Sequence, residues 1–125
     1  MSTPCKRYNN NTSYGTYYNY AGVSAGTITG NSNSTEATES VCPANWTLPT
    51  NSQQSGITSY TSSFSPVYSG DYNGGSLYDV GSYGYWWSST AYYSTYRHSL
   101  RYNSGRLRTF YDYRYGGHSA RCVRK

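Results

Sequence analysis

The chain has 125 residues, of which 18% are aromatic and only 12% are charged, and this balance predicts one folded domain over residues 1–125 rather than a disordered chain. No apolar run approaches the roughly 18 residues of a membrane-spanning helix, and the N-terminus has no apolar stretch of signal-peptide length. The net charge of +5 is uneven, because residues 97–125 carry seven arginines and one lysine against one acid, whereas residues 1–96 carry two basic and four acidic residues.

The first two-thirds of the sequence predicts short elements separated by loops. Stretches rich in Asn, Ser, Thr and Gly separate the few apolar positions, which is typical of loops. In chain order we expect an extended lead-in over 1–16, a short helix or strand over 17–25, a loop over 30–40, a helix from Thr50 or Asn51 to about Ser62, and irregular chain over 65–84.

From Tyr85 onward the pattern is that of β-strands. The stretch GYWWSSTA predicts a strand that carries two large aromatic residues. Residues 97–102 and 106–115 predict the two strands of a hairpin, joined by a turn at Asn-Ser-Gly, residues 103–105. Residues 118–123 alternate as a last strand.

Period-2 alternation assigns the faces of this hairpin. Leu100 and Leu107 mark the side that packs on the core, and the arginines mark a solvated outer side on which guanidinium and phenol groups are expected to gather. Strict alternation puts four further candidates on the leucine side, which makes them weaker predictions: His98, Tyr102, Tyr111 and Tyr113.

The sequence offers little for catalysis or for a bound cofactor. The two histidines and five acids form no local acid–base pair, and no cysteine has an activating base at a suggestive spacing. The three cysteines and two histidines lack zinc-site spacing, and the glycine pairs lack the lysine of a phosphate-binding loop. We therefore predict no enzyme, no metal and no cofactor.

The cysteines leave two alternatives open. Cys5, Cys42 and Cys122 are either three buried thiols, or Cys42 pairs with Cys122 and leaves Cys5 free. Closing so long a loop would stabilise the fold by about 4–5 kcal/mol, less any strain.

The strongest functional signal is the concentration of tyrosine and arginine near the C-terminus. Tyrosine offers a large contact area with only two side-chain torsions to freeze, and arginine adds charge and stacking, as in antibody binding surfaces and interface hot spots. The C-terminal excess of positive charge favours an acidic or electron-rich partner, expected to be a protein or another surface ligand. The predicted ligand-binding residues are Tyr93, Tyr96, Arg97, His98, Ser99, Arg101, Tyr102, Arg106, Arg108, Phe110, Tyr111, Asp112, Tyr113, Arg114, Tyr115 and His118.

Four blocks carry a resemblance to a known family: CPANWTLPT, GYWWSSTAYYSTYRHSL, YNSGRL and GGHSARCV. In combination they resemble the C-type-lectin-fold variable proteins of diversity-generating retroelements and the related FISUMP-type repeats of secreted bacterial proteins. The similarity runs from about Tyr17 to the end. It implies an α+β C-type lectin fold with small antiparallel sheets and one or two helices, and it places Cys42 and Cys122 at the family's framework disulfide.

The resemblance also implies programmed variation. In retroelement variable proteins the varied codons reach any residue except Lys, Glu, Gln, Met and Trp. Residues 88–121, the expected variable region, contain none of these five residue types, whereas the first 87 residues contain nine. At the rate of the first 87 residues, about three or four would be expected in the variable region. The implied function is target recognition on a cell or virion surface. The EPN, QPD and WND motifs of calcium-dependent lectins are absent from the sequence, which argues against calcium-mediated sugar binding.

Two other functions stay open. Basic residues interleaved with aromatics also suit a nucleic-acid-binding domain, which would bind unrelated oligonucleotides with a steep salt dependence. The chain would also suit an undiversified extracellular surface module of the FISUMP type. A neighbouring reverse transcriptase with a near-identical template separates the diversified protein from that module.

Overall fold

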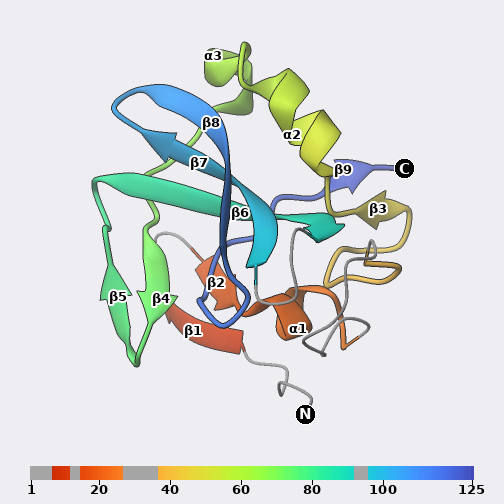
Figure 1. Ribbon diagram of the computed structural model, residues 1–125, viewed down its shortest axis with the longest axis horizontal. Helices are drawn as coiled ribbons and strands as arrows, with labels where there is room; N and C mark the ends of the chain where they lie inside the picture. The colour runs from red at the N-terminus through yellow and green to blue at the C-terminus, as the bar shows by residue number, and fades with distance from the viewer. Residues whose placement is uncertain (1–6, 12–14, 27–36, 92–95) are drawn as a thin grey trace.

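The computed structural model describes residues 7–11, 15–26, 37–91 and 96–125, and it shows an α+β protein made of small antiparallel sheets and short helices (Figure 1). This agrees with the expected fold class. No helix within these ranges is both long and apolar enough to cross a membrane. In chain order the elements are β1 (Arg7–Asn11), β2 (Gly15–Tyr18), α1 (Tyr20–Val23), β3 (Trp46–Thr47), α2 (Asn51–Ile57), α3 (Thr61–Phe64), β4 (Asp71–Asn73), β5 (Ser76–Tyr78), β6 (Tyr83–Ala91), β7 (Tyr96–Asn103), β8 (Arg106–Tyr113) and β9 (Val123–Arg124).

The central sheet has the order β6-β7-β8 and is antiparallel throughout. The predicted hairpin is confirmed, since β7 pairs with β8 from Tyr96↔Tyr113 to Asn103↔Arg106. Its turn, at Ser104 and Gly105, has positive φ at both residues (54° and 74°), which is the geometry that matches the twist of a two-residue hairpin.

Smaller pairs surround this sheet. The two-stranded sheets β1-β2, β3-β9 and β4-β5 are all antiparallel. The β4-β5 hairpin turns at Gly74 and Gly75 and lies within 65–84, so the prediction that this whole stretch is irregular is wrong. The predicted strand over 118–123 is also wrong, because His118 and Ser119 make isolated bridges to two different partners, and regular pairing begins only at Val123.

The predicted helix between residues 50 and 62 is present but interrupted. Thr50 caps α2 by accepting from the backbone N–H of Gln53, and the Gln53 side chain accepts from the backbone N–H of Thr50. The helix ends at Ile57, and Tyr60 starts the separate α3. With α1, the described residues hold three short helices, one more than the resemblance implies.

Both faces of the central sheet are covered, as Figure 1 shows with α2 and α3 above the sheet and α1 below it. Trp86 and Trp87 are adjacent in β6 and therefore point to opposite faces. On one face Trp86 packs with Leu100 and Leu107, and Ile57 and Phe64 close over them. On the other face Trp87 packs in a cluster with Tyr20, Val23 and Leu48.

Cys42 and Cys122, the pair that the resemblance implies, form a disulfide with a sulfur–sulfur distance of 2.00 Å. The bond spans 80 residues of sequence and ties the segment before β3 to the segment before β9. A loop of this length corresponds to about 4–5 kcal/mol of stabilisation in the chain-entropy model. Cys5 lies outside the described residues.

Candidate ligand-binding surface

The arginines of the hairpin do not form one solvated row. Arg97 and Arg114 are buried, with exposed fractions of 0% and 3%. The guanidinium carbon of Arg97 lies 5.2 Å from the ring centroid of Tyr20, its Nη1 donates to the carbonyl of Tyr96, and burial lowers its pKa. The prediction that these two arginines face solvent is wrong, because Tyr20 of α1 covers the face of β7 from which Arg97 projects. Arg114 lies outside any strand: β8 ends at Tyr113, two residues earlier than predicted, and the carbonyl of Arg114 accepts from the backbone N–H of Tyr20.

Ser99 and His118 are also buried, so the prediction that they contact a ligand at the surface is wrong. The imidazole of His118 stacks on the ring of Trp87 at 4.0 Å and on that of Tyr85 at 4.9 Å. Ser99 Oγ lies 3.1 Å from His118 Nδ1 and donates to the carbonyl of Trp86 at 2.9 Å. These contacts fix the histidine inside the core on the Trp87 side of the central sheet.

The buried histidine connects a hydroxyl to a carboxylate. His118 Nε2 lies 3.0 Å from Asp112 Oδ2, so Ser99, His118 and Asp112 form one hydrogen-bonded series. A serine nucleophile needs both an adjacent base and access to its substrate. Ser99 has neither, because its one hydroxyl proton is donated to the carbonyl of Trp86, which leaves Oγ to accept from His118 Nδ1, and its side chain is fully buried. The series therefore has the geometry of a structural network.

A second carboxylate lies beside this network. One ligand atom each from Asp71, Asp112 and His118 lies within 4.8 Å of the others, the one such group among the described residues that is compact enough to hold a metal ion. Desolvation raises the pKa of Asp71 from 3.8 to about 6. Burial also opposes ionisation of Asp112, but the hydrogen bond and positive charge of His118 outweigh it and hold that pKa below its usual value. Local sequence patterns did not indicate this cluster, because Asp71 in β4 is far along the chain from Asp112 and His118.

Asp71 supplies a prediction about stability and pH. Because the pKa of Asp71 is higher in the folded than in the unfolded state, its ionisation disfavours folding, and the full penalty is present above about pH 6. The penalty fades as the pH falls and is absent below pH 3.8, the ordinary pKa of the group. We expect Asp71→Asn to raise the melting temperature at about pH 7.5 and to lose that advantage near pH 4. Thermal unfolding at the two pH values measures this. The matched variant Asp79→Asn, at an exposed residue, should change little at either pH, and an equal gain from Asp71→Asn at both would contradict the assignment.

The most exposed aromatic residues of the hairpin lie on the leucine side. Tyr111 and Tyr113 have exposed fractions of 48% and 53%, although alternation made them weaker candidates. The ring centroid of Tyr96 lies 4.7 Å from that of Tyr113 and, edge-on, 5.6 Å from that of Tyr111. The hydroxyl of Tyr96 donates to that of Tyr113 at 3.2 Å, a hydrogen bond that raises the pKa of Tyr96. We call Tyr96, Tyr111 and Tyr113 the tyrosine cluster.

A smaller patch lies on the opposite face of the hairpin. Arg106 and Arg108 are exposed, and the half-buried Arg101 places its guanidinium carbon 4.7 Å from the ring centroid of Phe110. We call these four residues the arginine patch. Guanidinium and phenol groups therefore leave the hairpin on opposite faces, and the prediction that they crowd one outer side is wrong.

The remaining candidates are scattered around these two groups. Tyr115 is 48% exposed, beside the guanidinium of the buried Arg114. His98 and Tyr102 are half-buried, and Tyr102 stacks on Tyr68 with centroids 4.7 Å apart. Tyr93 lies outside the described residues.

Comparison with known protein families, curated proteins and solved structures finds no match to this chain. The structure itself defines a class: an α+β protein with a central three-stranded sheet covered on both faces and a group of exposed tyrosines on its outer hairpin.

Proposed function

We propose that this chain is a ligand-recognition protein and not an enzyme, and that the tyrosine cluster is the centre of its binding surface. The observation that carries the proposal is the exposure of Tyr111 and Tyr113 beside Tyr96 on two paired strands. Clustered aromatic residues on a solvent-facing surface are typical of interaction sites. Burial of Ser99 and His118 supports a role without catalysis.

The cluster is suited to binding because it is already ordered. Tyr96 and Tyr113 are cross-strand partners in the β7-β8 register, and their contact holds both rings in place before any ligand arrives. A binding surface that is rigid in advance loses less side-chain entropy on association. Arg106 and Arg108 are exposed on the opposite face of β8, so their charge would attract an acidic or electron-rich target at long range without contacting it at the tyrosine cluster.

We extend the proposal to the origin of this surface. The chain would be a retroelement-diversified protein with a C-type lectin fold, displayed on a cell or virion surface, with residues 88–121 as the variable region. The α+β architecture, the Cys42–Cys122 disulfide and the lack of Lys, Glu, Gln, Met and Trp in that region support this. An undiversified surface module of the same fold is the closest alternative.

Nucleic-acid binding is a second candidate, supported by Arg101 stacking on Phe110 beside the exposed Arg106 and Arg108. Burial of Arg97 and Arg114 removes two of the seven C-terminal arginines from any phosphate-binding surface. Binding to unrelated oligonucleotides that weakens steeply with salt would favour this candidate over protein recognition.

The genomic locus tests the claim of diversification. We expect a reverse transcriptase gene and a near-identical template copy whose differences from this chain fall at exposed positions, the tyrosine cluster above all. The buried residues Arg97, Leu100, Leu107 and His118 should be unchanged, since replacing them would disturb the core. Sequencing the locus and its relatives measures this, and a locus without a template, or with changes mainly at these buried positions, would refute the claim.

A further inference from the structure

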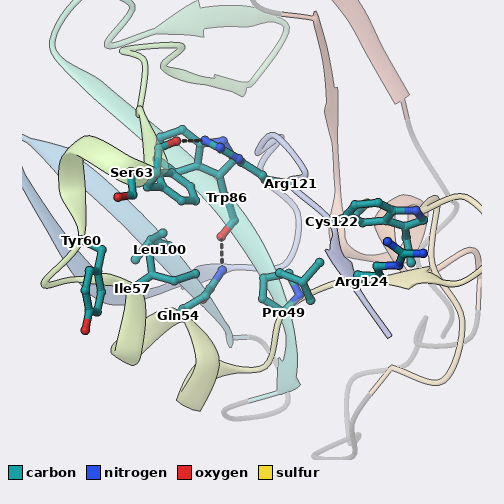
Figure 2. A pocket seen from close by; sticks show the side chains of 13 residues that line it. Pro49, Gln54, Ile57, Tyr60, Ser63, Trp86, Leu100, Arg121, Cys122 and Arg124 are labelled. Carbon is teal, nitrogen blue, oxygen red and sulfur yellow. Dashed lines mark hydrogen bonds between the residues drawn. The ribbon is translucent and has the colours of Figure 1, made fainter.

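A cavity of about 450 Å³ lies between α2, α3, the central sheet and the segment that leads into β9 (Figure 2). This volume falls in the range typical of small-molecule sites. It lies apart from the tyrosine cluster, none of whose residues lines it. Nothing in the sequence pattern indicated it, because its walls come from segments that are distant in the chain.

The walls of the cavity are mainly apolar. Trp86 and Phe64 stand edge to face with ring centroids 5.1 Å apart, and Ile57 and Leu100 lie beside them. Trp46, Pro49 and Val123 line the cavity from the side of the β3-β9 pair. Such walls favour a flat apolar or aromatic ligand that is able to pack against the indole and phenyl rings.

Gln54 gives the cavity one buried polar group. It is fully buried, and its Nε2 donates to the carbonyls of Trp86 and Trp87 at 3.1 and 3.3 Å, which fixes the orientation of the amide (Figure 2). Its Oε1 accepts no hydrogen bond from any described residue. A buried acceptor without a donor is costly, so a ligand that donates a hydrogen bond here would recover that cost.

The cavity has positive charge at its edge. Arg121 and Arg124 are the charged residues among those that line it, and no acid does. The guanidinium carbon of Arg121 lies 4.0 Å from the ring centroid of Phe64, and its Nη1 donates to the carbonyl of Phe64. These contacts hold the guanidinium next to the ring of Phe64, and its other N–H groups are suited to a carboxylate.

We propose that this cavity is a binding site for a small aromatic carboxylic acid that carries a hydroxyl group. The hydroxyl donates to Gln54 Oε1, the ring packs against Trp86 and Phe64, and the carboxylate binds Arg121. The side chains of the cavity set this order of hydroxyl, ring and carboxylate. Gln54 donates to the backbone carbonyl of Trp86, and the guanidinium of Arg121 packs on the ring of Phe64. This site is separate from the proposed recognition surface and does not depend on it.

The test uses 3-(4-hydroxyphenyl)propanoate as the probe, titrated against the whole chain by calorimetry. We expect saturable binding of one molecule per chain. Its analogue without the hydroxyl and its neutral amide should each bind about tenfold more weakly, since each loses one hydrogen bond or ion pair. Arg121→Gln should weaken binding of the acid about tenfold and leave the amide unchanged. Arg108→Gln, which removes an exposed arginine outside the cavity, is the matched control and should change neither.

A blocking variant keeps the test decisive. Ser63 is exposed on α3 and lines the cavity, so Ser63→Trp should fill it without loss of the fold, which circular dichroism and the melting temperature verify. We expect this variant to bind the probe at least tenfold more weakly. Absence of saturable binding to the wild type at millimolar probe, or equal binding by the wild type, Arg121→Gln and Ser63→Trp, overturns the proposal.

Discussion

Trp87→Ala is expected to destabilise the folded protein by about 3–5 kcal/mol, the usual cost of removing a large aromatic residue from a core. The Trp87 side chain has an exposed fraction of 0%. Its indole stacks on His118, meets Tyr20 edge-on at 5.3 Å, and donates from Nε1 to the carbonyl of Tyr18 at 2.7 Å. The substitution leaves a cavity at the point where β6, α1 and the segment after β8 meet.

The control for this prediction is Trp46→Ala, which removes the same side chain from a residue that is 42% exposed. Trp46 contributes its backbone to the β3-β9 pair, and alanine retains that backbone. We expect a loss of less than about 1 kcal/mol in the free energy of unfolding, the usual range for surface positions. Chemical denaturation of both variants measures the difference. Equal losses would show that the core on the Trp87 side of the sheet is assigned incorrectly.

The elements set by local sequence were predictable. The Asn-Ser-Gly turn and the alternation on either side of it predicted the β7-β8 hairpin, and the structure contains that hairpin. Thr50 and Gln53 specify the start of α2 through a capping box. In each case the deciding interactions join residues close together in the chain, which is why sequence patterns reveal them.

The environment of each face was not predictable in the same way. Alternation correctly separates Leu100 from Arg97 and Ser99, yet it does not say what covers each face. The core on the Trp87 side of the sheet covers Arg97, so the assumption that an arginine marks the solvent-exposed face was wrong. Tyr111 and Tyr113 show the converse, since they share the leucine face and are about half-exposed.

Sites assembled from distant segments left no sequence signal. Asp71, Asp112 and His118 lie in three separate segments and meet only in the folded protein. The cavity beside Gln54 is closed by a C-terminal segment that the disulfide holds in place. Such groupings depend on tertiary packing alone. The predictions of no metal and no cofactor rested on local spacing, which does not address clusters of this kind, and they stay predictions.

The double variant Tyr111→Ala/Tyr113→Ala tests directly whether the tyrosine cluster binds the target. Both side chains are about half-exposed, so their truncation should leave the melting temperature nearly unchanged. If each is a hot spot worth about 2 kcal/mol and the two losses add, affinity should fall about 700-fold. The matched control is Tyr60→Ala/Tyr78→Ala, two tyrosines with exposed fractions of 65% and 53% outside the hairpin, which should alter affinity less than about twofold.

The measurement is surface plasmon resonance against a target recovered by affinity selection on the wild-type chain, with all three proteins compared at one salt concentration. A loss of binding confined to the Tyr111→Ala/Tyr113→Ala protein is the result that we predict. Retention of wild-type affinity by that protein, or an equal loss in the Tyr60→Ala/Tyr78→Ala control, would contradict the assignment of the binding surface.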